Sequence, residues 1–306
     1  AKEVNVRTIV KLTCIIQGAM LLSIVAMSQI GIIPDYIFDA STRQRHGLGF
    51  LWTTTGAILY FYFMVLYIYL REERAHLIEY VILEAVNFGL YKLTDARMSF
   101  YLSTLLLVYV YVMRFYWQNR KDRIRKNRLL IGAPAFFCIL AVACQIFYVP
   151  TDARWQKINS VLSGRLELGC FGWRDYGFSL LGTKIEWIGF SHNATAGTYN
   201  YVDCSYMQIL LENGLIPLII IIAVYTYIMY MAVKEKDFYL QTAVLLITAF
   251  SITEPRLLNL AYNPLPFFGI TYISLRGRSA LFHREGHRLN RRVRFRTTHV
   301  RLKMRK

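Results

Sequence analysis

The apolar residues of this chain fall into long blocks, and the charged residues lie between the blocks. A helix needs about 20 apolar residues to cross the hydrocarbon core of a bilayer, which is about 30 Å thick. We therefore predict an all-α polytopic membrane protein with about eight transmembrane helices. They lie at approximately residues 8–30, 48–70, 75–93, 98–118, 128–149, 213–233, 238–254 and 264–276.

Composition supports contact with lipid. Hydrophobic residues make up 55% of the 306 residues, whereas soluble domains contain about 45–50%. We expect a transmembrane domain over residues 1–276 and a basic tail over residues 277–306.

The basic residues between the blocks predict the orientation, because cytoplasmic loops of membrane proteins are enriched in Lys and Arg. Residues 119–128 contain six basic residues and one acid, and residues 276–306 contain twelve basic residues and one acid. One orientation places both segments, the N-terminus and the turns at 71–74 and 234–237 in the cytoplasm. We expect a multi-pass protein of the cytoplasmic (inner) membrane with both ends of this chain cytoplasmic. The net charge of +17 is then explained by contact with anionic membrane lipids rather than with nucleic acid.

The outer face then holds one large loop at about residues 150–212. Loops of this length without strong secondary structure are often functional. We therefore expect the chemistry of the protein on the extracytoplasmic side.

Arginines stand at two entries to this outer face. Arg43 and Arg45 precede the second apolar block, and Arg165 lies early in the large loop. A guanidinium presents a planar fork of donors that matches phosphate oxygens. Arg45 and Arg165 are each followed four residues later by a glycine, which would leave space for an anion. The alternative interpretation is a helix start with arginines at the membrane interface.

Other outer residues have two interpretations each. Asp203 is either a general base or an acid that favours a helix start, and His192 is either an acid–base group or simply solvated. Two segments, 95–97 and 254–256, each contain an acid and an arginine. Each pair is either functional or a local ion pair that fixes the turn. Aromatic residues of the large loop either stack on sugars or lie at the membrane interface: Trp155, Trp173, Tyr176, Trp187, Tyr199 and Tyr201.

Several patterns are absent from the sequence. It contains no Walker motif, GxGxxG, HExxH, Gly-x-Ser-x-Gly or CxxC, which disfavours a nucleotide-driven or metal-dependent enzyme. We expect neither a metal site nor a cofactor. A disulfide framework is not expected either, although Cys170 and Cys204 both lie in the large loop and would allow one bridge.

Four segments of the chain resemble motifs of the bacterial polysaccharide polymerases of the O-antigen and capsule type, together with the related O-antigen ligases. Residues 43–50 resemble an Arg…Arg-Ser-Leu-Gly-Phe entry into a span, and residues 93–97 resemble a Thr-x-Ser-Arg turn. Residues 162–165 resemble the Ser-Gly-Arg that opens the large loop. Residues 202–214 resemble Asp-Asn-x-Tyr followed by Leu-x-x-x-Gly.

The chain departs from this family in three places. Ala96 replaces a serine, Cys204 replaces an asparagine, and residues 51–54 replace the usual His-Pro-Asn. The family usually has more than eight spans, arranged in a GT-C-like fold. Because the chain begins at Ala1 without a methionine, we expect that an N-terminal part of this fold precedes it.

The resemblance implies a metal-independent glycosyltransferase that polymerises polyprenyl-pyrophosphate-linked oligosaccharide repeat units on the outer face of the membrane. The product would be capsular, exo- or O-antigen polysaccharide, and a flippase and a chain-length regulator are expected partners. An acceptor hydroxyl attacks the donor anomeric carbon and polyprenyl pyrophosphate leaves, which requires stabilisation of developing charge. The expected site consists of pyrophosphate or sugar ligands and two candidates for the base: Arg43, Arg45, Arg165, Arg97 and Tyr206, with Asp203 or His192.

Two other functions fit the same sequence. An O-antigen-type ligase would use the same donor with another acceptor. A transporter or flippase of lipid-linked sugars should instead show charges along a central path and no dominant outer loop. A membrane partner without activity is a third alternative.

Overall fold

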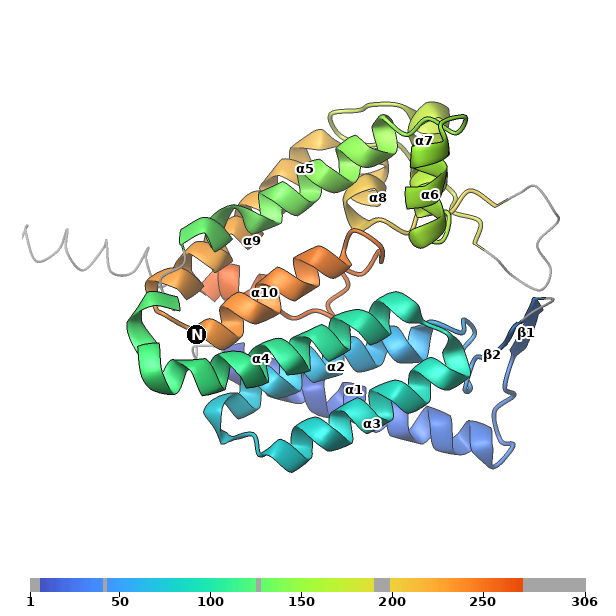
Figure 1. The fold of residues 1–306 in the computed structure, drawn as a ribbon. Helices are drawn as coiled ribbons and strands as arrows, with labels where there is room; N and C mark the ends of the chain where they lie inside the picture. Colours follow the sequence, from blue (N-terminus) through green and yellow to red (C-terminus); the bar gives the residue numbers. More distant parts are fainter. Residues whose placement is uncertain (1–5, 41–42, 125–127, 190–198, 272–306) are drawn as a thin grey trace, which may run out of the picture.

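The computed structural model describes residues 6–40, 43–124, 128–189 and 199–271, and nearly all of its regular structure is helical (Figure 1). The first half of the chain forms four long helices and one short hairpin: α1 (Val6–Gln29), β1 (Ile37–Ala40), β2 (Arg43–His46), α2 (Thr55–Arg71), η1 (Glu72–Arg74), α3 (Leu77–Thr94) and α4 (Arg97–Ile124). The second half forms η2 (Arg128–Gly132), α5 (Ala133–Ile146), α6 (Ala153–Val161), α7 (Arg165–Tyr176), α8 (Ser205–Glu212), α9 (Leu215–Lys234) and α10 (Phe238–Phe250).

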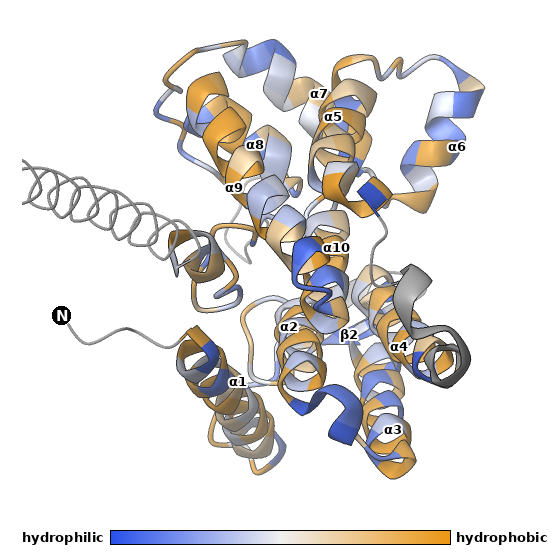
Figure 2. Cartoon of the chain, turned by 90° about the vertical axis from the view of Figure 1, so that its left-hand side faces the viewer, coloured by the Kyte–Doolittle hydropathy of each residue, from blue (hydrophilic) through white to orange (hydrophobic). Residues whose placement is uncertain are grey.

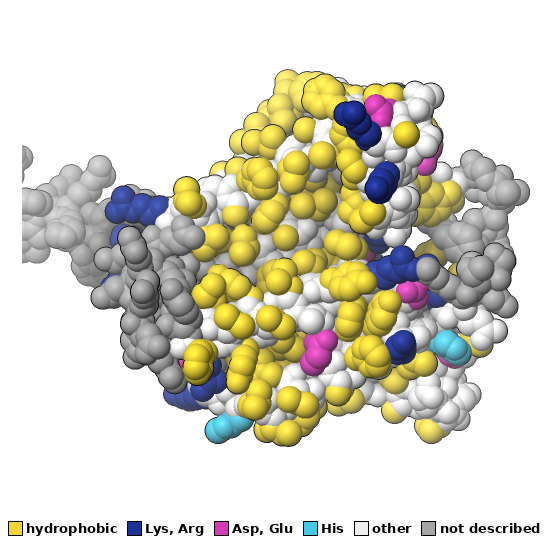
Figure 3. All heavy atoms as spheres, in the orientation of Figure 1, with side chains coloured by type: hydrophobic (Ala, Val, Ile, Leu, Met, Phe, Trp, Pro, Cys, Tyr) yellow, Lys and Arg dark blue, Asp and Glu magenta, His cyan; other side chains and the backbone are white. Residues whose placement is uncertain are grey.

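Apolar helix surfaces identify this as an α-helical protein suited to a membrane. Among the described residues, four helices are long and apolar enough to cross a bilayer: Val6–Gln29, Arg97–Phe115, Arg128–Ile146 and Leu215–Lys234. Only 22–33% of the residues in these windows are buried inside the protein. Hydrophobic residues cover most of α5 and α9 (Figure 2) and spread across the middle of the face shown in Figure 3. An apolar surface of this extent requires lipid or a partner.

Helical structure occupies part of each of the eight predicted segments, but several boundaries differ. The second helix begins at Thr55 rather than near residue 48, and α10 ends at Phe250 rather than near residue 254. Residues 266–271 are helical at the end of the described range. The basic tail lies outside the described residues.

Helix α10 is the central element of the fold. It packs against α2 and α4 on one side and against α5 and α9 on the other (Figure 1). Nearly every residue of α10 is buried, as expected for a helix that is apolar all round. At its end, the Phe250 ring lies 4.4 Å from that of Phe61 on α2. The central position of α10 places the residues that follow it at the junction of the two helix groups.

Two polar residues of α3, Glu84 and Asn87, are hydrogen-bonded within the α3–α4 pair. Thr104 Oγ1 donates to Glu84 Oε1 at 2.7 Å. Asn87 Nδ2 donates to Glu84 Oε2 at 3.2 Å and to the Phe100 carbonyl at 3.2 Å. Polar groups in an apolar environment are stable only with such partners, so α3 remains a continuous helix through this point.

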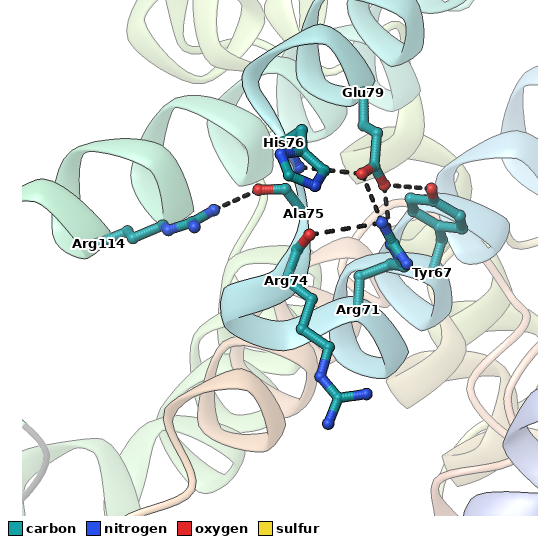
Figure 4. A network of polar contacts seen from close by, with 7 residues as sticks. All are labelled: Tyr67, Arg71, Arg74, Ala75, His76, Glu79 and Arg114. Carbon is teal, nitrogen blue, oxygen red and sulfur yellow. Dashed lines mark hydrogen bonds and ion pairs between the residues drawn. The ribbon is translucent and has the colours of Figure 1, made fainter.

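The predicted cytoplasmic turns and the predicted outer segments gather at opposite ends of the bundle (Figure 1). At one end, the α2–α3 turn is closed by Arg71, which donates to Glu79 at 2.6 and 2.9 Å (Figure 4). Tyr67 also donates to Glu79, and Arg114 of α4 donates to the Ala75 carbonyl. The hairpin β1–β2, the α3–α4 turn, α6 and α7 lie at the other end.

The large predicted loop is more regular than its sequence indicates. It contains α6, α7 and α8. Asp152 caps α6 by accepting from the Arg154 amide at 2.7 Å, and α7 starts directly after Gly164, which has φ +83°. Of these short helices, α6 and α7 are not apolar blocks, so hydropathy alone does not reveal them. They give the segment between α5 and α9 a fixed framework of helices.

Candidate functional site: an arginine-lined cavity

A cavity of about 630 Å³ opens at the end of the bundle that bears β1–β2 and α7. Its walls come from the hairpin, the start of α2, the first residue of α7, and the segments that precede α8 and follow α10. Its volume is within the range of small-molecule sites, roughly 300–1,000 Å³. Segments from both halves of the chain therefore meet in one concave site.

Arg165 is the centre of the polar wall. Its Nη2 donates to Glu254 Oε1 at 3.0 Å, across 89 residues of sequence. Its Nε lies 3.6 Å from Asp203 Oδ2. The side chain is only 16% exposed, so both ion pairs lie in a partly dehydrated environment. One arginine thus joins α7 to the segment before α8 and to the segment after α10.

Arg45 and Arg256 bring two more guanidinium groups to the same cavity. Arg45 Nη2 lies 3.4 Å from Asp95 Oδ2, and Arg256 lies over the Tyr262 ring at 5.2 Å. The Nε atoms of Arg45 and Arg256 are buried and have no hydrogen-bond partner among the described residues, and the buried Nε of Arg165 has only its 3.6 Å ion pair with Asp203. Buried donors without partners are costly. An anion in the cavity would relieve that cost.

Two carboxyl groups balance part of this positive charge. Asp203 lines the cavity, and burial raises its pKa, opposed by Arg165 and Arg256. Glu254 lies in the segment after α10 and is 6% exposed. Burial raises the pKa of Glu254 to about 7, also against the effect of Arg165 and Arg256. The wall therefore combines permanent positive charge with acids that ionise less readily than free carboxyls.

Hydrogen bonds of Ser205 hold the two acids together. The Ser205 hydroxyl donates to the Glu254 carbonyl at 2.6 Å, and the Leu257 amide donates to that hydroxyl at 3.2 Å. The Ser205 amide donates to the Ser251 carbonyl at 2.9 Å. The start of α8 is thereby fixed to the turn after α10, which places Asp203 beside Glu254.

Aromatic side chains form the other wall. Trp52, Trp187, Tyr199 and Tyr201 line the cavity, and the rings of Trp187 and Tyr201 meet edge to face at 6.1 Å. The main chain passes close to Trp52 at Gly189, where an added Cβ would lie 3.7 Å from the indole. Aromatic faces suit the apolar faces of sugar rings, as they suit other flat apolar groups.

Three predicted site residues, Arg45, Arg165 and Asp203, line this cavity. Arg97 does not line it; its Nε lies 3.3 Å from Asp95, the residue that also pairs with Arg45. Tyr206 lies elsewhere: it is fully buried and its hydroxyl donates to the Thr248 carbonyl at 2.6 Å. Its motif position corresponds to a core hydrogen bond rather than to a cavity contact.

Two predicted site residues cannot be placed in the cavity. His192 and the side chain of Arg43 lie outside what the structure describes, although the Arg43 backbone belongs to β2.

Glu254, Arg256 and Trp52 were not among the expected ligands. In the sequence, Glu254 and Arg256 are marked only by the acid–arginine pair at 254–256. That pair is consistent either with a functional role or with fixing a turn. The structure favours a wider role than fixing the turn, because Glu254 binds Arg165 of another helix. Nothing in the sequence around Trp52 distinguishes it from an interfacial tryptophan.

The glycines four residues after Arg45 and Arg165 serve packing instead of anion binding. An added Cβ at Gly49 would lie 3.0 Å from the Ile24 carbonyl of α1. An added Cβ at Gly169 would lie 1.6 Å from Gln145 Oε1 on α5. Both glycines allow close approach of backbone to a neighbouring helix, so the repeated spacing reflects two packing contacts.

Within the described residues, no three His, Cys, Asp or Glu side chains form a group suited to a metal ion. All five cysteines are free, including Cys170 and Cys204, so the bridge that their positions would allow is not formed.

No protein family matches the chain, and no curated protein or solved structure is detectably similar to it. Function is therefore inferred from the cavity and its chemistry.

Proposed function

We propose that this chain is a membrane glycosyltransferase that polymerises polyprenyl-pyrophosphate-linked oligosaccharide repeat units on the outer face of the cytoplasmic membrane. One observation above all supports this: three arginines line a single cavity, next to two carboxyl groups. In this proposal the chain crosses the bilayer about eight times, and the end with α6 and α7 faces outward. The polyprenyl tail then lies in the lipid, with its pyrophosphate at the cavity.

The cavity offers each group that this reaction needs. Arg45, Arg165 and Arg256 stabilise the charge that develops on the departing polyprenyl pyrophosphate. Asp203 accepts the proton of the acceptor hydroxyl as this oxygen bonds to the anomeric carbon and the bond from that carbon to the pyrophosphate oxygen breaks. A raised pKa makes Asp203 a stronger base than an ordinary carboxylate. The aromatic wall holds the sugars, and positive charge comes from arginine without a metal ion.

Replacement of Arg165 tests this function in cells that depend on the protein. We expect Arg165→Ala to abolish long-chain glycan and to leave single repeat units accumulating on the lipid carrier. Arg165→Lys should also fail, because lysine is a point charge and cannot bind two phosphate oxygens as a fork. The measurement is gel analysis of glycan chain length together with mass spectrometry of the carrier lipids.

The matched control is Arg174→Ala, which removes an exposed arginine from the same helix. It should retain the normal chain-length distribution, and all three variants should be present in the membrane. Normal glycan in Arg165→Ala would contradict the proposal. Loss of the lipid-linked repeat from the outer leaflet in that variant would indicate a transporter instead.

A further inference from the structure

Glu254 occupies a place where a bound anion would be expected. Its Oε1 lies 3.0 Å from Nη2 of Arg165, the arginine at the centre of the cavity. The carboxyl group is almost fully buried, so the bulk solvent does little to stabilise its charge. In this arrangement, the carboxylate therefore occupies a donor of Arg165 that a phosphate group would use.

We propose that Glu254 acts as an exchangeable internal anion: it holds Arg165 while the cavity is empty and takes up one proton when a phosphate or pyrophosphate group binds. This inference rests on the proposed function, since it requires the cavity arginines to bind phosphate oxygens. Anion binding at this site is then coupled to protonation of Glu254.

The physical reason is competition for one guanidinium. When Arg165 donates to a bound anion, Glu254 loses part of the interaction that favours its charged form. The anion also adds negative charge beside a buried carboxylate that already faces Asp203. Both changes favour the neutral acid. The balance is one proton from solvent for each Glu254 carboxylate that becomes a carboxylic acid, with no bond broken in the ligand.

Asp203 is the other carboxyl group that pairs with Arg165, and the Glu254→Gln variant distinguishes its proton uptake from that of Glu254. The groups that influence the charge of Glu254, or are influenced by it, come from α2, α7 and the segments before α8 and after α10: Tyr62, Arg165, Tyr199, Tyr201, Asp203 and Arg256. The two arginines stay charged. Burial raises the pKa of Tyr199 to about 12 and also raises that of Tyr201, so both stay neutral near pH 7.

The direction of the pH dependence follows from linkage. With a pKa of about 7 beside Arg165, Glu254 is already neutral in acidic solution, and binding there takes up no proton. At neutral pH about half of the Glu254 carboxyls are charged, and binding takes up about half a proton; well above neutral pH they are all charged, and binding takes up as much as one. Anion affinity should therefore be constant at low pH and fall by up to about tenfold per pH unit above neutrality.

The experiment is calorimetric titration of sulfate and of inorganic pyrophosphate into the whole chain in lipid nanodiscs. Each titration is run near neutral pH in two buffers of different ionisation enthalpy, because the difference in heat reports the protons taken up. Sulfate binds no proton near neutrality, so any uptake comes from the protein. The variant is Glu254→Gln, and Glu167→Gln is the control, since Glu167 is on the same helix as Arg165 and does not line the cavity.

Near neutral pH, we expect the wild-type chain and Glu167→Gln to take up about half a proton per sulfate, because about half of the Glu254 carboxyls are already protonated. Glu254→Gln should bind sulfate with no proton uptake and with affinity that does not change with pH. Binding without proton uptake in the wild-type chain, or equal uptake in Glu254→Gln, would overturn this inference and leave the arginine site intact. No binding of either anion to the wild-type chain would overturn the arginine site as well.

Discussion

Arg256 shows how a residue can acquire a role from its surroundings. In sequence it belongs to a short acid–arginine turn, but in the structure it reaches the same cavity as Arg45 and Arg165. Its Nε is buried without a hydrogen-bond partner among the described residues, like that of Arg45. Three guanidinium groups around one space can surround a pyrophosphate in a way that a single arginine cannot.

Arg256→Ala should lower the affinity for inorganic pyrophosphate by roughly ten- to a hundredfold, since hydrogen bonds to charged groups are worth about 1.5–3 kcal/mol. Calorimetry measures this directly. Arg154→Ala, which removes an exposed arginine of α6, should bind as the wild-type chain does. Equal affinity in both variants would remove Arg256 from the site.

Tyr206 illustrates the opposite case, in which a residue expected at the site belongs to the core. Because its hydroxyl is buried against the Thr248 carbonyl, Tyr206→Phe should lower the free energy of unfolding by about 1 kcal/mol. Anion affinity should not change. Thermal unfolding in detergent and calorimetry separate the two effects, and a weaker anion affinity at unchanged stability would restore Tyr206 to the site.

At the scale of elements, the aromatic wall depends on a close contact between two backbone turns. The Thr183 amide donates to the Leu211 carbonyl at 3.1 Å, and the Ile216 amide donates to the Leu180 carbonyl at 3.1 Å. Gly182 lies in this contact with φ +88°, and an added Cβ would lie 2.1 Å from the Glu212 carbonyl oxygen. This contact fixes the segment that leads to Trp187.

Gly182→Ala should therefore lower the melting temperature more than Gly177→Ala. Gly177 also has positive φ, at +67°, but an added Cβ there would meet nothing within 4 Å. The control variant carries only backbone strain, about 1–3 kcal/mol, whereas Gly182→Ala adds a collision with main-chain atoms. Differential scanning fluorimetry compares them, and equal melting temperatures would mean that the two turns can separate without cost.

At the scale of the whole molecule, segments with opposite predicted locations lie at opposite ends of the bundle (Figure 1). The α9–α10 turn and the α2–α3 turn share one end, and α6 and α7 share the other. The arrangement agrees with a single orientation across a membrane. The positive-inside bias then predicts which end is cytoplasmic.

Labelling of introduced cysteines tests this orientation. In intact spheroplasts, a membrane-impermeant maleimide should label Lys157→Cys on α6 and should not label Lys234→Cys at the end of α9. Both positions are exposed. In inverted vesicles the pattern should reverse, and the wild-type chain provides the background, since four of its five cysteines are buried. Labelling of Lys234→Cys from outside would mean that the cavity faces the cytoplasm.

The long helices could be predicted from sequence because burial in lipid or in an apolar core depends on local runs of apolar residues. The short helices α6 and α7 could not, because they lie outside the long apolar blocks and are defined by caps and turns. The predicted start of α2 is wrong for a different reason, since an apolar segment need not be helical. Residues 47–50 are apolar or glycine, yet they form a turn against α1.

The sequence by itself determined the helical class of the protein and most of its helical segments, since these follow from residue type and local pattern. It also singled out Arg45, Arg165 and Asp203, which the structure brings to one cavity. Only the tertiary structure decided which charged groups meet. Helix α10 packs between the two helix groups. This packing pairs Arg165 with Glu254, places Arg256 at the cavity and buries Tyr206 in the core. Contacts between residues far apart in the chain are set by that packing, and no local pattern records them.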